Sequence, residues 1–362
     1  MCDRSDFAFG IFIVYPMGVS RSSDRGYTTP LMSIRLVQLQ HPSRGRAIAI
    51  VEEPHLRLLR RQRGITELTR DAIDESKHLH EVLDPGDELL PYDPIYDGDS
   101  EWALLSPFDH WQAEKLFITG TGLTHKASAE NRQSMHGDPA AITDSMKMYR
   151  IGLDGGRTQS GCIGSMPEWF YKGTGRIVRA HGEALDIPNH GDDGGEEAEI
   201  AGCYLIDADG TPVRIGLVQG NEFSDHVLES KNYLYLAQSK LRSCSLGPEI
   251  VIGGDLAKEI RGEARIERGD KTIWSGPLAS GEPWMCHTLA NLEHHHFKHD
   301  EHRHPGDAHV HFFGADLFSF KDRLKLEDGD VMVVSFEGFG RPLRNPIRID
   351  RSEQTFVSVR AL

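Results

Sequence analysis

The chain has 362 residues, of which 38% are hydrophobic and 26% charged, an ordinary balance for a globular protein and a length sufficient for two domains. Its formal net charge of −15 argues against a nucleic-acid or anionic-membrane partner, because phosphate binding requires clustered Lys and Arg. No run approaches the roughly 20 apolar residues of a transmembrane helix. The five cysteines have no C-x-x-C spacing, which favours reduced thiols and a cytoplasmic location.

The first 31 residues contain an apolar run, FAFGIFIVYPM, behind an acidic MCDRSD. A signal peptide has a basic segment before its apolar run. We therefore interpret residues 1–31 as a disordered extension, with the folded part beginning at Met32. A poor signal peptide is the alternative.

The next segment predicts a small α/β domain over residues 32–106. Two strands, 34–40 and 46–53, flank the turn PSRGR, and residues 68–83 have the apolar spacing of a helix. Residues 84–102 are dense in Pro, Gly and Asp, which indicates a connector before the second domain.

Residues 107–362 are rich in short apolar segments separated by Gly, Asp and Pro. A helix is predicted over 226–240 and another in either 125–136 or 142–152. Regular βαβ alternation is absent, so the chain is expected to be α+β and β-rich rather than a doubly wound sheet. The predicted strands cover residues 197–206, 211–220, 248–253, 263–269, 271–276, 330–338 and 355–361.

Glu197 and Glu199 stand two apart at the start of a predicted strand, in GEEAEIAGCYLI. Strand side chains alternate, so both carboxylates face the same side and repel each other unless a proton or a cation lies between them. A hard divalent cation is one resolution, and a solvated strand face is the alternative. Asp225, in GNEFSDHVLE, offers a third carboxylate where the next strand gives way to a helix.

Several motifs occur in a fixed order: PEWFYKG, EAE, SD, a Lys shortly before LGP, and the block from PGDAHVHFFG to GRPLRNPI. In this order they resemble the fumarylacetoacetate hydrolase (FAH) superfamily, over roughly residues 120–347. GTGLTHKASAEN, EHHHF and HVHFFG are most similar to its bacterial branch of 2-keto-3-deoxy-D-arabinonate dehydratase-like sugar-acid proteins. The resemblance implies a mixed β-roll catalytic domain over 107–362 and a homodimer.

The resemblance also implies roles for individual residues. Glu197, Glu199 and Asp225 match the carboxylates that hold Mg²⁺ or Mn²⁺. Glu168 matches the acid/base glutamate and Lys240 the catalytic lysine, while His125 is similar to the mobile histidine segment that closes over the substrate. The expected contacts with the substrate come from Ser165, Lys172, Phe312 and Gly314.

This site predicts Mg²⁺-dependent dehydration of a 2-keto-3-deoxy sugar acid, such as the pentonate of the D-arabinonate form, to 2,5-dioxopentanoate. The cation polarises the keto group, and a glutamate removes a proton from C3. A hydroxyl at C4 then leaves as water. A carbonyl at C4 would instead permit hydrolysis of an acylpyruvate or another β-diketo acid, which His125 favours. A non-catalytic sugar-acid-binding protein is the second alternative.

Eight histidines occur within residues 294–311. We interpret this segment as a solvated, partly helical surface, because paired Cys and an H-E-x-x-H motif are both absent. An adventitious metal site is the alternative. His309 and His311 alternate along a predicted strand, so one of them could line the pocket.

Overall fold

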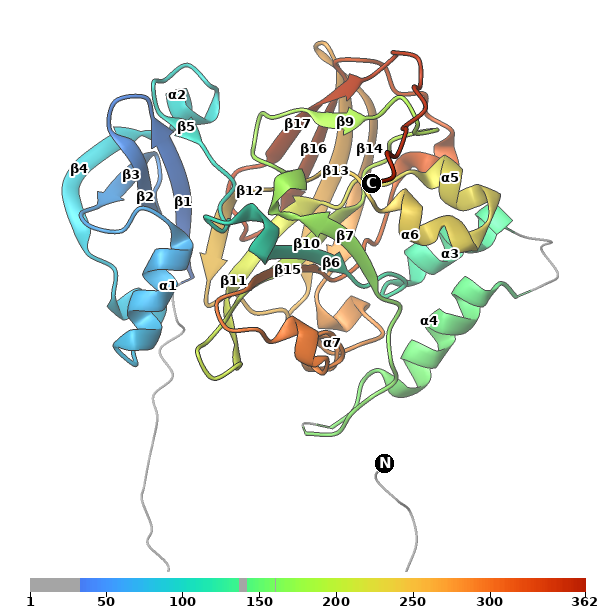
Figure 1. The fold of residues 1–362 in the computed structure, drawn as a ribbon, viewed down its shortest axis with the longest axis horizontal. Helices are drawn as coiled ribbons and strands as arrows, with labels where there is room; N and C mark the ends of the chain where they lie inside the picture. The colour runs from blue at the N-terminus through green and yellow to red at the C-terminus, as the bar shows by residue number, and fades with distance from the viewer. Residues whose placement is uncertain (1–32, 137–141, 160) are drawn as a thin grey trace, which may run out of the picture.

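The computed structural model describes residues 33–136, 142–159 and 161–362. The predicted extension over residues 1–31 lies outside the described residues. Two β-sheets form the body, with helices around them (Figure 1), which confirms the β-rich α+β class. Over the described ranges, no helix has the length and apolarity needed to cross a membrane.

The larger sheet has 12 strands among the described residues and extends through both predicted domains. Its order is β4-β3-β2-β1-β12-β11-β10-β15-β6-β7, with β5 beside β1 and β8 beside β12. Because β1 pairs with β12, the expected boundary near residue 107 falls within one continuous sheet, and the division into domains stays a prediction. The strands are β1 (Ile34–His41), β2 (Gly45–Glu52), β3 (His55–Leu59), β4 (Pro85–Pro91), β5 (Ala103–Leu104), β6 (Leu116–Gly120), β7 (Phe170–Thr174), β8 (Val178–Arg179), β10 (Ala198–Ile206), β11 (Pro212–Asn221), β12 (Cys244–Ile252) and β15 (Ala308–Phe312).

The N-terminal unit, on the left in Figure 1, contains β1 to β5 with α1 (Ile65–Asp74) and α2 (Tyr92–Tyr96). Two expectations are corrected here. The helix predicted over 68–83 begins and ends earlier, and the predicted connector over 84–102 contains β4 and α2. β4 is the edge strand of the sheet, where Pro at its two ends interrupts no ladder of hydrogen bonds.

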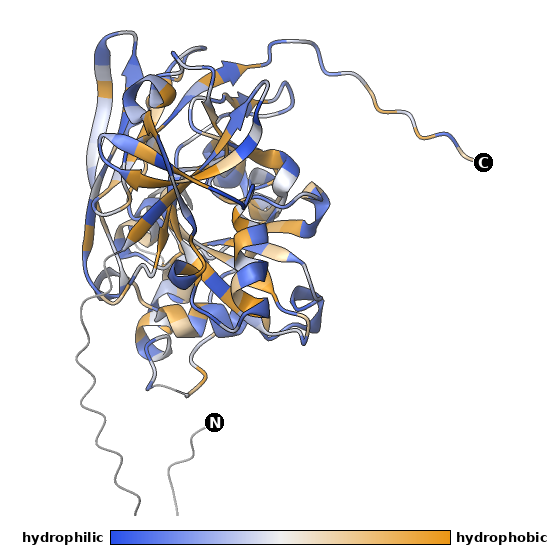
Figure 2. Ribbon diagram, turned by 90° about the vertical axis from the view of Figure 1, so that its left-hand side faces the viewer, coloured by the Kyte–Doolittle hydropathy of each residue, from blue (hydrophilic) through white to orange (hydrophobic). Residues whose placement is uncertain are grey.

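The smaller sheet has the order β14-β13-β16-β17-β9 and packs on the larger one. A buried cluster joins Ile200 and Leu217 of the larger sheet to Ala264 and Val334 of the smaller sheet. Figure 2 shows apolar segments concentrated inside the body, so burial of these strands holds the two sheets together. The strands are β9 (Leu185–Ile187), β13 (Ile260–Arg268), β14 (Lys271–Ser280), β16 (Val331–Phe336) and β17 (Leu343–Ile349).

Helices gather at one end of the sheets, on the right in Figure 1. Both candidate segments, 125–136 and 142–152, are helical, as α3 (Lys126–His136) and α4 (Asp144–Gly155). The single helix predicted over 226–240 is broken into α5 (His226–Lys231), the 3₁₀ turn η4 (Tyr233–Tyr235) and α6 (Leu236–Ser239). A further helix, α7 (Leu289–Phe297), carries part of the histidine-rich segment.

The prediction of a strand over residues 355–361 is wrong. These residues form no strand and are fully exposed, and Figure 2 shows the segment extending away from the body. Its β-branched residues favour extended backbone, but a strand also requires a sheet edge beside it.

Candidate active site

The hairpin of β10 and β11 brings three carboxylates together. Ala198 pairs with Asn221, and the N–H of Glu222 donates to the carbonyl of Glu197 at 2.9 Å. Residues that lie opposite each other in a ladder point to the same face. Glu197, Glu199 and Glu222 therefore each offer an oxygen within 4.8 Å of the others, and all three side chains are buried.

The structure corrects the third predicted metal ligand, because Asp225 does not join this group. One oxygen of Asp225 accepts the N–H of Leu228 at 2.8 Å and caps α5. The other oxygen accepts from Arg242 Nη2 at 2.7 Å and from the N–H of Asp192 at 2.9 Å. With its oxygens engaged in this way, Asp225 stabilises the start of a helix, and Glu222 takes its place among the carboxylates.

Lys240, the predicted catalytic lysine, lies among the carboxylates at the end of α6. Its ammonium donates to Glu197 Oε1 at 2.6 Å, to Glu222 Oε2 at 2.5 Å and to Ser224 Oγ at 3.0 Å. Burial opposes the charge of Lys240, but Glu197 and Glu222 outweigh it and raise the pKa of the ammonium. His226 Nε2 lies 3.0 Å from Glu197 Oε1. The charge of Lys240 and this contact with His226 together overcome the effect of burial and lower the pKa of Glu197.

Lys172 supports Glu222 from beneath. Its Nζ donates to the carbonyls of Phe223 at 2.7 Å and Lys240 at 3.0 Å and lies 2.7 Å from Glu222 Oε1. A lysine has three N–H donors, and these partners engage all of them. The expected contact between Lys172 and the substrate is therefore corrected to the positioning of Glu222.

Glu168, the predicted acid/base, lies beside the group and belongs to a buried polar network. Arg132 Nη1 of α3 donates to Glu168 Oε2 at 3.2 Å, and the Tyr233 hydroxyl donates to Glu168 Oε1. Burial raises the pKa of Glu168, although Arg132 and Tyr233 act in the opposite direction. A Cβ on Gly122 would lie 1.8 Å from Glu168 Oε2, so glycine is required for this close approach.

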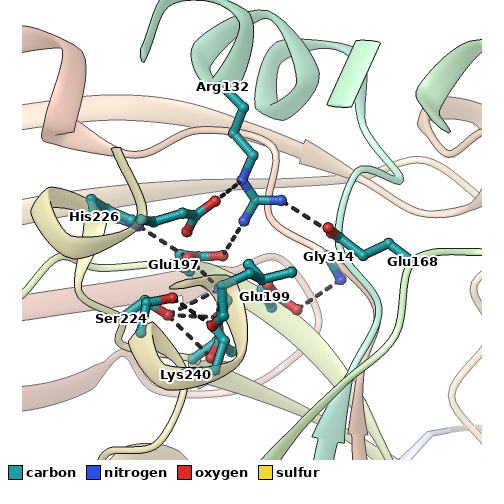
Figure 3. Close-up of polar contacts among 12 residues, drawn as sticks. Arg132, Glu168, Glu197, Glu199, Ser224, His226, Lys240 and Gly314 are labelled. Atoms are coloured by element: carbon teal, nitrogen blue, oxygen red, sulfur yellow. Dashed lines mark hydrogen bonds and ion pairs between the residues drawn. The ribbon is translucent and has the colours of Figure 1, made fainter. Parts of the chain in front are cut away.

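Arg132 also approaches two further carboxylates. Its Nε lies 2.7 Å from Glu229 Oε1 and its Nη2 lies 3.9 Å from Glu197 Oε2. Figure 3 shows the guanidinium pointing between Glu168 and Glu197. Sequence reasoning missed Arg132 and Glu229, because neither residue stands in a motif that indicates its role.

Two other predicted residues have hydrogen-bond partners other than the three carboxylates. His125 Nδ1 lies 2.9 Å from Thr124 Oγ1, and burial lowers the pKa of His125 to about 4. The N–H of Ser165 donates to the carbonyl of Gly155 at 2.8 Å, and the carbonyl of Ser165 accepts from Asn291 at 2.9 Å. None of these contacts is with one of the three carboxylates.

Gly314 contacts Glu199 through its backbone, and Phe312 packs in the core on the same face of the sheet. The N–H of Gly314 donates to Glu199 Oε2 at 2.7 Å, and Figure 3 shows this contact. A Cβ on Gly314, whose φ is +100°, would lie 2.0 Å from Thr124 Oγ1. Phe312 is fully buried in the core, beside Gly220. Both residues therefore shape the site through Glu199 and the packing beneath it.

Three histidines of the 294–311 segment are buried. His296 Nε2 lies 3.1 Å from His309 Nδ1, and the rings of His296 and His311 stack at 4.4 Å. Burial lowers the pKa values of His309 and His311 to about 3. The expectation of a solvated surface is thus wrong for these three side chains. Phe312 shares the carboxylates' face of the sheet through its pairing with Ala201, so the alternating His309 and His311 point away from the site.

The carboxylates fit a divalent cation. Burial, and then the negative charges of Glu222 and Glu197, raise the pKa of Glu199 well above its usual value. A cation between them would relieve this repulsion, and oxygen ligands suit a hard ion such as Mg²⁺. Counted formally, with every carboxyl ionised and His226 neutral, the connected network has five carboxylates and three Lys or Arg side chains, which leaves an excess of two negative charges. These are Glu168, Glu197, Glu199, Glu222 and Glu229 against Arg132, Lys172 and Lys240.

Comparison with known proteins supports the fold. No profile of a known protein family matches the chain. A probable 2-keto-3-deoxyxylonate dehydratase of Haloferax volcanii is 26% identical over 178 residues, which are 48% of this chain and 58% of that protein. The matched part is therefore less than two thirds of that relative.

Solved structures resemble the chain over most of its length. A 2-keto-3-deoxyarabinonate dehydratase superposes with a TM-score of 0.66 and 19% identity, and covers 88% of this chain and 100% of its own. The structure of 2-keto-3-deoxy-D-arabinonate dehydratase complexed with magnesium and 2,5-dioxopentanoate has a TM-score of 0.65 at 18% identity, with the same coverage of both chains. A 2-hydroxyhepta-2,4-diene-1,7-dioate isomerase from Mycobacterium marinum has a TM-score of 0.54 at 17% identity, again covering 88% of this chain and all of its own. The chain thus has the fold that its resemblance to the FAH superfamily predicts.

Proposed function

We propose that the chain is a lyase that dehydrates a 2-keto-3-deoxy sugar acid in the presence of Mg²⁺. The substrate that we infer is a 2-keto-3-deoxypentonate, such as the D-arabinonate form, and the product is 2,5-dioxopentanoate. The convergence of Glu197, Glu199 and Glu222 within 4.8 Å carries the proposal, because it provides a buried site for a divalent cation. The dehydratase names of the Haloferax relative and of two structural neighbours, one of them complexed with magnesium and 2,5-dioxopentanoate, support the reaction class.

The protein side chains have distinct tasks in this reaction. A divalent cation held by the three carboxylates supplies a Lewis acid that polarises the keto group and acidifies C3. Glu168 is the candidate base that takes a proton from C3. The three donors of Lys240 are engaged by Glu197, Glu222 and Ser224, so its ammonium would offset negative charge on the keto oxygen through its charge and not through a hydrogen bond. The C3–H and C4–O bonds break, a C3–C4 double bond forms, and the proton held by Glu168 leaves with the hydroxyl as water. A proton then moves from C5 to C3, which gives the C4–C5 enol, and transfer of the enol's hydroxyl proton to C4 gives the aldehyde at C5.

A coupled assay with D- and L-configured 2-keto-3-deoxypentonates tests this proposal. We expect 2,5-dioxopentanoate to form with Mg²⁺ and not after EDTA treatment. The variant Glu197→Gln should be inactive, while Glu301→Gln, an exposed acid outside the site, should be active. Cleavage of acylpyruvates without turnover of any keto-deoxy acid would favour the hydrolase alternative. Ligand binding with no turnover of either class would favour the sugar-acid-binding alternative.

The homodimer and the cytoplasmic location stay predictions. The oligomeric state is measurable by light scattering of the purified protein, for which we expect twice the mass of the 40.5 kDa chain.

A further inference from the structure

Glu229 of α5 is a buried carboxylate that the proposed reaction does not use. Its side chain is 0% exposed. Its Oε1 lies 2.7 Å from Arg132 Nε, but the N–H is not directed at it. Among the residues that the structure describes, neither oxygen of Glu229 receives a hydrogen bond. A buried carboxylate without such donors is costly, so Glu229 is suited to a donor that comes from outside the chain.

Arg132 connects this carboxylate to the candidate active site. The same guanidinium that approaches Glu229 lies 3.2 Å from the candidate base Glu168 and 3.9 Å from Glu197. The pair of Arg132 and Glu229, which we call the buried pair, therefore adjoins the base and one carboxylate of the cation site. Figure 3 shows Arg132 between Glu168 and Glu197. A 2-keto acid with its carboxyl end at the cation and C3 at Glu168 must direct C4 and C5 past Glu168.

We propose that the buried pair binds hydroxyl groups on the tail of the substrate and so selects hydroxylated 2-keto acids over those with an apolar tail. This inference rests on the proposed function and names the residues that set its substrate class. A hydroxyl group is both a donor and an acceptor. It can donate to Glu229, which has no aligned donor of its own, and accept from the guanidinium of Arg132.

The selectivity follows from burial. An apolar tail would leave the fully buried carboxylate of Glu229 without a hydrogen-bond donor. Sites built to bind a hydroxyl group reject analogues that lack it far more strongly than apolar pockets reject a change of size. The buried pair therefore disfavours acylpyruvates with alkyl tails.

Binding of two matched ligands to the Mg²⁺-loaded protein tests the inference by calorimetry. Both carry a hydroxyl in place of the keto group, so neither can be enolised or turned over. One is 2,4,5-trihydroxypentanoate in both C4 configurations, and the other is 2-hydroxypentanoate. We expect the wild type to bind one of the trihydroxy acids at least about tenfold more tightly. In Glu229→Gln this preference should be lost, while the affinity for 2-hydroxypentanoate stays within about threefold.

Two further variants control the experiment. Glu130→Gln makes the same acid-to-amide change at an exposed position of α3 and should keep the wild-type preference. The double variant Arg132→Gln/Glu229→Gln removes both charges, so it leaves no new unpaired charge within the pair, and it should lose the preference as Glu229→Gln does.

The outcomes separate the inference from the proposed function. A folded Glu229→Gln or double variant that keeps the wild-type preference overturns the inference. A wild type that dehydrates keto-deoxy acids but binds both ligands equally also overturns the inference and leaves the function intact. A wild type that prefers the hydroxylated ligand but dehydrates no keto-deoxy acid overturns the function alone. Binding of neither ligand, without turnover, overturns both.

Discussion

Replacement of Glu199 by Gln should stabilise the protein without Mg²⁺ and weaken its response to Mg²⁺. Glu199 is buried, and its oxygen accepts a hydrogen bond from the N–H of Gly314. Unlike Glu197 and Glu222, Glu199 forms no ion pair among the described residues with a Lys or Arg. Its pKa is raised by burial and by the two neighbouring carboxylates, so its ionised form destabilises the folded state.

The size of the effect follows from the separation of the charges. The carboxylate oxygens lie within 4.8 Å of one another, and two unit charges at that limiting distance repel each other by about 3.5 kcal/mol at an effective dielectric constant of about 20. Lys240 offsets part of this repulsion, so we expect Glu199→Gln to stabilise the metal-free protein by about 1–3 kcal/mol. For a chain of this size the gain corresponds to a Tm increase of about 1–4 °C.

The pH dependence has a definite sign. A raised carboxyl pKa contributes stability at low pH that is lost as the pH rises through the folded-state pKa. The advantage of Glu199→Gln should therefore be small at low pH and should grow as the pH rises above the ordinary carboxyl range near 4.3. Mg²⁺ binds the ionised carboxylates, so it should raise the Tm of the wild type more than that of the variant.

Thermal denaturation with EDTA and with Mg²⁺, at pH 5 and pH 8, measures these differences. Glu196→Gln is the matched control, because Glu196 is equally buried but accepts from Ser319 at 2.8 Å and lies outside the group of three carboxylates. We expect the Tm change caused by Glu196→Gln to be the same with and without Mg²⁺. The reasoning is refuted if Glu199→Gln destabilises the metal-free protein at pH 8 and leaves the Mg²⁺-induced Tm increase unchanged.

The remaining predictions concern the other site residues. Glu222→Gln should weaken Mn²⁺ binding at least about tenfold, whereas Asp225→Asn should leave it within about threefold. Because Asn caps a helix as well as Asp does, Asp225→Asn should lower stability through the lost ion pair with buried Arg242, by about 3 kcal/mol. Calorimetry and thermal denaturation measure both effects, and the opposite ranking of the two affinities would restore Asp225 as a ligand. Glu168→Gln should lower kcat by about 10²–10⁴ without loss of cation affinity, and a fully active variant would exclude Glu168 as the base. Because a base must be ionised and burial raises the pKa of Glu168, kcat should fall with decreasing pH at values above the ordinary carboxyl range near 4.3; a wild-type profile that is flat down to pH 4 would contradict this. Lys240→Met should lower kcat even where the cation is bound, and its full activity would remove the ammonium from the mechanism.

The strands, the fold class and the pair Glu197 and Glu199 were within reach of sequence reasoning, because each rests on local alternation. The third carboxylate was not, because it depends on register. Without the irregularity between Cys203 and Tyr204, the pairing of Ile206 with Pro212 would place Glu197 opposite Asn221. One extra residue in the ladder shifts the pairing and brings Glu222 opposite Glu197. Asp225 did carry a local signal of its own, since Asp before a helical segment is a frequent N-cap.

The polar network around Glu168 also lay beyond the sequence. Arg132 reaches Glu168 and Glu229 only because α3 folds against α5, and no motif spacing indicates this contact. The buried histidines were misjudged for a different reason. Their density suggested a solvated segment, but His309 and His311 alternate with Val310 and Phe312 in a strand buried on both faces, so tertiary packing decided their exposure.

A crystal structure of the Mn²⁺-soaked protein tests the cation site most directly, because Mn²⁺ is located by its anomalous scattering. We predict one strong peak bound by oxygens of Glu197, Glu199 and Glu222, at about 2.0–2.3 Å from each. A peak held by Asp225 or by His296 and His309, with the three glutamates free of metal, would contradict the account.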